Sequence, residues 1–194
     1  MTYQRIRLAA LVLLGVLTAP TALAVTDFSE RLTLENHQLQ RVGIGSIRYA
    51  GIVHVYDAAL YAPLQNTTKN ILDAATPKRL EILYHRPIEA KLMVEAAQRM
   101  LERQHGTHTL ERWQPSIDRL HAAYRDVAAG DRFALAMSPE RGLWLEYNGR
   151  ELVSIEDPEF GRLYFGIWLG DQPLSAGLRD ALLPGECCRS KSVD

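Results

Sequence analysis

The feature that most constrains the fold of this chain is the apolar run at residues 52–61, Ile-Val-His-Val-Tyr-Asp-Ala-Ala-Leu-Tyr. Its β-branched start and its low polar content are typical of a central strand rather than a surface strand. Residues 43–48, Gly-Ile-Gly-Ser-Ile-Arg, continue an earlier strand, and Ala50-Gly51 predicts a turn between the two segments. The chain therefore has the centre of a sheet near its N-terminal end.

Further segments alternate between apolar and polar residues, which is the pattern of half-buried strands. Asn148-Gly149 is the strongest hairpin signal in the chain, because both residues tolerate the positive φ of a type I′ turn. These patterns predict antiparallel strands at residues 31–35, 39–42, 79–84, 132–137, 143–147 and 151–155.

Apolar residues at helical spacing predict long helices at residues 89–104 and 115–128 and a third that starts at Asp157-Pro158. Shorter helices are expected at 68–75 and 175–183. In the third helix, an apolar face is expected to pack on the sheet and close one end of a cleft; it consists of Phe160, Leu163, Ile167 and Trp168. The fold class predicted is α+β, an antiparallel sheet with helices on one face, in a single domain over residues 25–183.

The first 24 residues have the pattern of a signal peptide. Arg5 and Arg7 precede an apolar stretch at 8–17, and Ala22-Leu-Ala24 is a small-x-small cleavage site, so we expect the mature chain to begin at Val25. The apolar stretch is too short to span a bilayer of about 30 Å. We therefore expect a periplasmic or secreted protein with no stable membrane insertion.

Charge argues against a polyanionic partner. The whole chain has a formal net charge of −1, and loss of Arg5 and Arg7 leaves 20 basic against 23 acidic residues, a net charge of −3. This balance lacks the basic surplus of a nucleic-acid-binding protein, so the expected partner is a small apolar or anionic molecule. Cys187 and Cys188 are adjacent, close no loop, and lie in a tail, residues 184–194, that we expect to be disordered.

Arg48 is the first candidate for a binding residue. Gly43 and Gly45 remove side chains beside it, so that backbone or a ligand can approach. A guanidinium stays charged in a protein and needs solvent or an anion as its partner. The alternatives to an anion site are a solvated arginine at a sheet edge and one paired with a nearby carboxylate.

Tyr56 and His54 are the other candidates, because strand parity places both on one face beside Arg48. An arginine with a tyrosine hydroxyl suits a carboxylate or a phenolate; the alternative for Tyr56 is a core residue. Parity places Asp57 on the face opposite His54, so we expect no acid–base pair between them. His105 and His108 lack a third ligand nearby in sequence, and we expect no metal site and no cofactor.

Several segments together resemble the exported bacterial chalcone isomerase-like family over residues 28–183. They are Gly43-x-Gly-x-x-Arg48, Val-Tyr-Asp-Ala-Ala-Leu-Tyr at 55–61, Gly130-Asp131, Asn148-Gly149 and Phe-Gly-Ile-Trp-Leu-Gly at 165–170. The resemblance implies an open-faced β-sandwich, in which a large antiparallel sheet is covered by helices on one side and a cleft lies between them.

The resemblance also implies residue roles. Arg48 matches the arginine that holds the substrate phenolate in plant chalcone isomerases, and Tyr56 falls near the position of their threonine. The plant tyrosine has no counterpart, because residues 89–93 read Glu-Ala-Lys-Leu-Met. In fatty-acid-binding relatives an arginine and a tyrosine clamp a carboxylate, which Arg48 and Tyr56 imitate.

The leading hypothesis is therefore a non-catalytic domain that binds a small apolar, fatty-acid-like ligand through Arg48, with Tyr56 and His54 beside it. The alternatives are an intramolecular lyase of the chalcone isomerase type, with Arg48 stabilising developing charge, and a scaffold that binds a protein partner.

Overall fold

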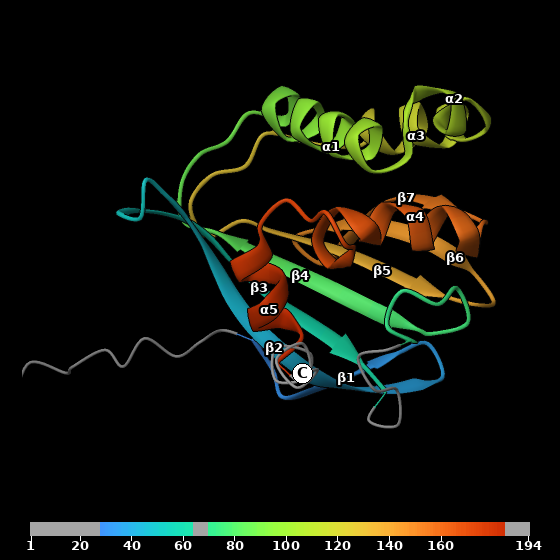
Figure 1. Ribbon diagram of the computed structural model, residues 1–194. Coiled ribbons are helices and arrows are strands. Elements are labelled where there is room, and N and C mark those ends of the chain that lie inside the picture. Colours follow the sequence, from blue (N-terminus) through green and yellow to red (C-terminus); the bar gives the residue numbers. More distant parts are fainter. Residues whose placement is uncertain (1–27, 64–69, 185–194) are drawn as a thin grey trace, which may run out of the picture.

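A computed structural model describes residues 28–63 and 70–184. Its centre is a seven-stranded antiparallel sheet in which each strand pairs with the next along the chain (Figure 1). The strands are β1 (Arg31–Leu34), β2 (His37–Tyr49), β3 (Val53–Ala62), β4 (Lys78–Tyr84), β5 (Arg132–Ser138), β6 (Gly142–Tyr147) and β7 (Arg150–Ile155). The predicted α+β class with an antiparallel sheet is confirmed.

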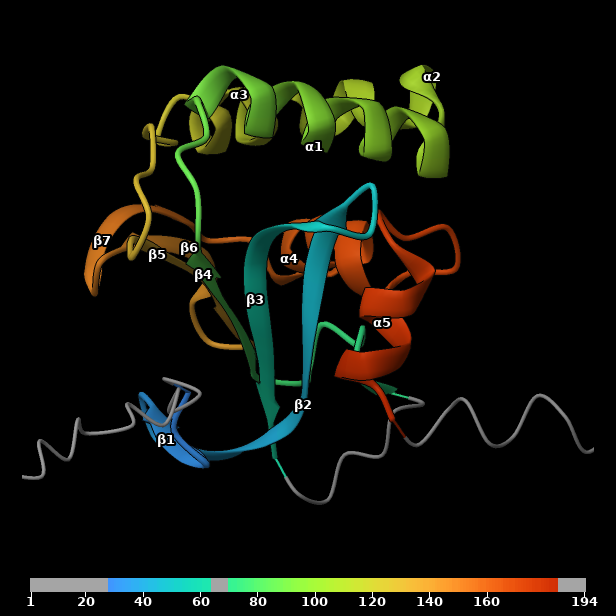
Figure 2. The ribbon, with the colours of Figure 1, turned by 90° about the vertical axis from the view of Figure 1, so that its left-hand side faces the viewer.

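The helices of the described residues lie on one side of this curled sheet (Figures 1 and 2). They are α1 (Ala90–His105), α2 (Thr107–Leu110), the 3₁₀ turn η2 (Glu111–Trp113), α3 (Gln114–His121), α4 (Pro158–Leu169) and α5 (Ala176–Leu182). α4 lies between the sheet and the outer layer formed by α1 and α3, and α5 packs along β2. None of the described helices combines the length and the apolar character that crossing a membrane requires.

Local sequence signals explain where several elements begin and turn. Asn148 and Gly149 have φ values of 49° and 76° and join β6 to β7, as the type I′ signal predicts. The Asp157 carboxylate accepts a hydrogen bond from the backbone N–H of Phe160 and caps α4. The Ser175 hydroxyl caps α5 in the same way.

The two glycines of β2 make room for a helix. A Cβ atom at Gly43 would lie 2.3 Å from the backbone oxygen of Ala181, and one at Gly45 would lie 2.7 Å from Leu178 Cδ1. The close approach expected from the Gly-x-Gly pattern is therefore made by α5, whose backbone lies directly on β2.

Two helix predictions are wrong in part. Of the helix predicted at 68–75, residues 68 and 69 lie outside the described residues, and residues 71–76 form turns instead, since the Thr76 hydroxyl donates to the Asn70 carbonyl and the Asp73 carboxylate accepts from the Ala75 N–H. α3 ends at His121 instead of continuing to 128, because the chain bends there so that Val127 pairs with Ile88.

The sheet buries side chains on both faces. The main core lies between the sheet and the helices, and a smaller cluster on the other face contains Phe28, Leu34, Leu39, Ala59, Tyr61, Ala136 and Trp144. The proposed signal peptide and the two cysteines lie outside the described residues.

Candidate functional site

An apolar pocket of about 190 Å³ lies between α1, α4 and the helix-facing side of strands β3 to β6. Every side chain that lines it is apolar or aromatic. The lining residues are Tyr56, Ile82, Tyr84, Ile88, Leu92, Met93, Ala96, Ala97, Tyr124, Phe133, Leu135, Leu145, Ile167, Trp168 and Leu174. The predicted cleft beneath the apolar face of the helix at 158–169 is therefore present, with Ile167 and Trp168 in its wall.

Two polar groups of the pocket wall lack a well-formed hydrogen bond. The Tyr56 hydroxyl and the Trp168 indole N–H are buried and lie near each other, but their contact does not reach hydrogen-bond geometry, and neither has another partner within the described part of the chain. The two side chains are only 7% and 8% exposed. An unpaired buried donor costs about 1–3 kcal/mol, so these two donors mark the polar end of an otherwise apolar pocket.

Burial keeps the pocket tyrosines neutral. It raises the pKa of Tyr56 to about 12, against a smaller opposing effect of the Trp168 side chain. Burial also raises the pKa of Tyr124 to about 12 and that of Tyr84 well above its ordinary value. All three hydroxyls thus remain protonated at neutral pH, so they donate hydrogen bonds and do not act as bases.

The other two pocket hydroxyls already have partners. The Tyr84 hydroxyl lies 3.3 Å from the Met93 sulfur, and the Tyr124 hydroxyl lies 3.3 Å from that of Tyr164. Tyr56 and Trp168 are therefore the donors that a bound molecule can engage without breaking an existing contact.

The pocket opens beside two exposed leucines. Leu92 on α1 is 53% exposed and Leu174, which follows α4, is 41% exposed, and both belong to the pocket wall. Exposed large apolar side chains at the rim of a cavity are typical of an entrance for an apolar ligand.

The structure separates Arg48 from Tyr56. Tyr56 faces the pocket, whereas Arg48 is exposed near the end of β2 and is not one of the pocket-lining residues. The expectation that both line one cleft is wrong, because the helix-facing residue at this end of β2 is Ile47, which lies opposite Tyr56, and Arg48 falls on the other face. In the register of β2 and β3, the residue opposite Arg48 is His54.

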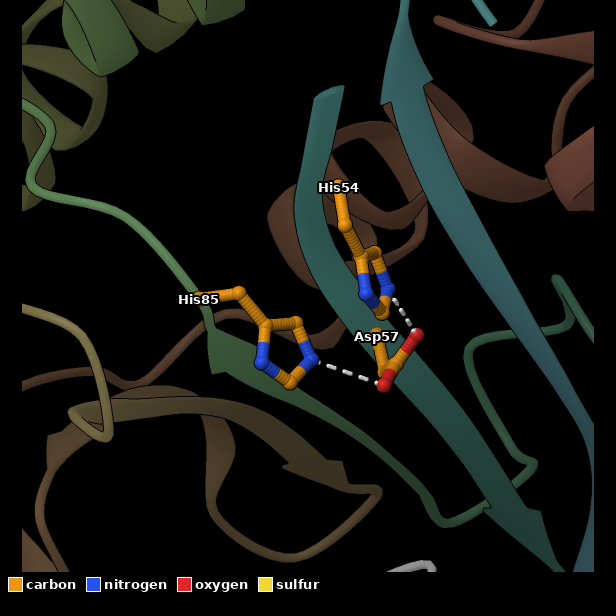
Figure 3. A group of neighbouring side chains, drawn as sticks. All are labelled: His54, Asp57 and His85. Atoms are coloured by element: carbon orange, nitrogen blue, oxygen red, sulfur yellow. Dashed lines mark hydrogen bonds and ion pairs between the residues drawn. The ribbon is translucent and has the colours of Figure 1, made fainter. Parts of the chain in front are cut away.

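His54 and Tyr56 point to opposite faces, contrary to the parity argument. Ile47 pairs with Tyr56 but Arg48 pairs with His54, so Val55 is the extra residue of a β-bulge. A bulge reverses the alternation beyond it. His54 therefore shares a face with Asp57, and its Nε2 atom lies 2.7 Å from the Asp57 Oδ1 atom (Figure 3). The expectation that the two residues face apart is wrong.

The pocket donors were only partly accessible to sequence reasoning. The sequence predicts Tyr56 as a binding residue from its strand position and Trp168 as part of an apolar helical face, but nothing in the sequence indicates that the two meet one cavity. Tyr84 and Tyr124 belong to a strand end and to a bend after α3, and no local pattern distinguishes them from core residues.

Comparison with known proteins gives a family and a fold. The sequence model of the family described as chalcone isomerase-like matches residues 21–184. Among solved structures, a fatty-acid binding protein of Arabidopsis thaliana superposes with a TM-score of 0.61 at 13% sequence identity, over 80% of this chain and 90% of that one. No curated protein matches the chain in sequence.

Proposed function

The chain belongs to the chalcone isomerase-like family, and from that premise we propose that it binds a small apolar molecule with an anionic, hydrogen-bond-accepting end in the pocket under α1. The apolar part contacts the aliphatic and aromatic wall. The accepting group takes the hydrogen bonds of the Tyr56 hydroxyl and the Trp168 indole.

The two unpaired donors carry this proposal. A carboxylate or carbonyl oxygen between them would accept from both and remove the cost of their burial. A wholly apolar ligand would leave both donors unpaired. The donors therefore favour a fatty-acid-like or phenolic molecule over a hydrocarbon.

The size of the pocket limits the ligand. Pockets for drug-sized molecules have volumes of roughly 300–1,000 Å³, and this one has about 190 Å³. A medium-chain acid or a single-ring phenol fits that volume better than a long-chain fatty acid. The similar fold of the Arabidopsis fatty-acid binding protein supports the same class of ligand.

The composition of the wall supports binding rather than isomerisation. Among the residues that line the pocket there is no carboxylate, imidazole, ammonium or guanidinium group. The tyrosines have raised pKa values, so an enzymatic base is missing from this wall. Proton transfer to or from a reacting group needs a positioned acid or base whose pKa lies near the working pH.

Calorimetric titration of decanoate tests the proposal. We expect one decanoate per chain and an affinity about tenfold lower for Tyr56→Phe, which loses one hydrogen bond to a charged acceptor and keeps the ring. Ala97→Leu fills the pocket without touching either donor and should abolish binding. Tyr61→Phe is the matched control, since Tyr61 is buried on the other face of the sheet with an equally unpaired hydroxyl. Equal affinity in all four proteins would refute the pocket as the site.

Arg48 remains a prediction for the anchor of the anionic group. Because it is exposed and outside the pocket wall, it would act only on a group that projects from the entrance. Arg48→Ala in the same titration decides between the two arrangements. A loss larger than that of Tyr56→Phe, in a folded variant, would assign the anionic end to Arg48.

We also propose that the protein works after export. The support is the signal-peptide pattern of residues 1–24. Protein recovered from its native host should begin at Val25, and full-length protein retained in the cytoplasm would contradict export.

A further inference from the structure

We infer that His54, Asp57 and His85 form a binding site for a divalent transition metal, best suited to Zn²⁺, on the face of the sheet opposite the pocket. The three side chains come from β3 and from the residue that follows β4, and they point toward one another (Figure 3). One ligand atom from each lies within 4.8 Å of the other two. This group does not belong to the pocket described above.

Both imidazoles already aim a ring nitrogen at the same carboxylate. His54 Nε2 lies 2.7 Å from Asp57 Oδ1, and His85 Nε2 lies 2.8 Å from Asp57 Oδ2. The ring centroids are 4.1 Å apart. The two imidazoles thus converge on one carboxylate, each at a different oxygen, which gathers three ligand side chains in one place.

The distances require only a small adjustment. Zinc binds His nitrogen at about 2.0–2.1 Å and carboxylate oxygen at about 2.0–2.2 Å, which in a tetrahedral site separates ligand atoms by roughly 3.3 Å. The contacts between Asp57 and the two imidazoles would lengthen by about half an ångström to admit the ion. Rotation of side chains that are 24–33% exposed provides this change without moving the strands.

The chemistry of the ligand set selects the metal. Two imidazoles with one carboxylate suit Zn²⁺ and its neighbours in the first transition row. Ca²⁺ and Mg²⁺ prefer oxygen ligands and should bind far more weakly. Three protein ligands on a partly exposed surface leave a fourth position for water or an anion, as in open zinc sites.

The surroundings hold the carboxylate in place. The Ser46 hydroxyl on β2 hydrogen-bonds to Asp57 Oδ1. Partners that orient a ligand in this way typically change metal affinity by about 10–100-fold when removed.

The geometry also argues against a serine nucleophile here. A Ser–His–Asp hydrolase needs the serine hydroxyl on the histidine, and the histidine on the carboxylate. The Ser46 hydroxyl is instead bonded to Asp57 itself, so the cluster lacks that order.

Zinc titration of untagged full-length protein against a chelating dye tests the site. Cys187→Ser and Cys188→Ser are introduced in every variant, because adjacent thiols bind zinc independently. We expect one Zn²⁺ per chain, an affinity lowered at least tenfold by His85→Gln or Asp57→Asn, and no competition from an equal concentration of Ca²⁺. His108→Gln is the matched control, since His108 is exposed and pairs with the single carboxylate of Glu111.

A measurement on protein that keeps all three metal-binding side chains distinguishes loss of the site from loss of the fold. In the ¹⁵N spectrum, Zn²⁺ should shift the Nε2 resonances of His54 and His85 and leave those of His37 and His108 in place. Zinc binding that survives His85→Gln at full strength, or a titration that leaves both Nε2 resonances unmoved, would overturn the inference.

Discussion

The two faces of the seven-stranded sheet both bury apolar side chains, but ion pairs are built into only one of them among the described residues. On the face under the helices, the side chains around the pocket are apolar or are neutral tyrosines. On the other face, Arg79 forms a two-pronged ion pair with Glu146, with both nitrogen–oxygen distances at 2.8 Å, and a second ion pair with Glu81. Alternation along the same strands builds both faces, so one sequence provides an apolar site and a charged surface layer.

The difference between the two faces of the sheet explains why the two proposed sites differ in chemistry. A small apolar ligand gains free energy by leaving water for a wall without charges. A metal ion needs charged or polar ligands that remain partly hydrated. The pocket and the His54–Asp57–His85 cluster each lie on the face that meets those requirements.

The largest expected effect concerns the charged face. Glu146→Ala should lower the free energy of unfolding by about 3 kcal/mol, because it removes a largely buried partner from Arg79. It also leaves the Trp144 indole N–H without its carboxylate acceptor. Urea denaturation measures the loss. The control is Glu151→Ala, whose pair with Arg141 is more exposed and should cost less than about 1 kcal/mol. Equal losses in the two variants would remove the buried ion pair as a source of stability.

On the helix face, Gly43→Val should destabilise the fold by about 3 kcal/mol or slightly less, since the new Cβ meets the backbone of α5 and no side-chain rotation relieves the contact. Gly177→Ala serves as the control, because a Cβ there meets nothing within 4 Å. We expect that control to be neutral or slightly stabilising in the same denaturation series. A Gly43→Val variant as stable as the parent would show that α5 does not rest on β2.

Lys78 is an exception to the apolar character of the helix face. It is fully buried beside Met137 and Phe165, and its ammonium group donates to the carbonyls of Asp73 and Thr76. Burial lowers the pKa of Lys78 to about 7, only partly offset by Asp73. Above pH 7 the folded state therefore binds fewer protons at this position than the unfolded state, in which the pKa is about 10.4.

The free energy of unfolding should consequently rise between pH 7 and pH 9, by up to about 1.4 kcal/mol per pH unit. Lys78→Met should flatten this rise, whereas Lys91→Met, at an exposed position of α1, should not. Urea denaturation at pH 7, 8 and 9 gives the slopes. Identical slopes for the parent and Lys78→Met would mean that Lys78 titrates normally in the folded protein.

The smallest effect is expected where neither face is involved. Gly149→Val should cost about 1 kcal/mol or somewhat more, because φ is 76° there and a β-branched residue is strained in that region. Nothing lies within 4 Å of the added Cβ, so any loss reports backbone strain alone. An unchanged denaturation midpoint would contradict the strained turn.

Sequence patterns predicted the sheet, the Asn148-Gly149 hairpin and most helices, because each depends on neighbours along the chain. The site was less accessible. The bulge at Val55 changes which residues share a face, and no local pattern reveals it, so strand parity alone groups His54 with Tyr56 instead of Asp57. Gly43 and Gly45 suggested a close approach but did not distinguish a ligand from α5. The residues of α1 and α4 that complete the pocket wall around Tyr56 are distant in sequence, and only tertiary packing brings them together.

The indole N–H resonances of Trp168 and Trp144 distinguish ligand binding in the pocket from binding elsewhere, because the two indoles lie on opposite faces of the sheet. The Trp168 N–H lacks a well-formed hydrogen bond among the described residues, whereas the Trp144 N–H already donates to Glu146 at 2.8 Å. Titration of ¹⁵N-labelled protein with decanoate should move the Trp168 resonance downfield as it acquires an acceptor, and the Trp144 resonance should stay in place. A saturating titration that leaves the Trp168 resonance unmoved would contradict the proposal that the ligand accepts a hydrogen bond from Trp168 in this pocket.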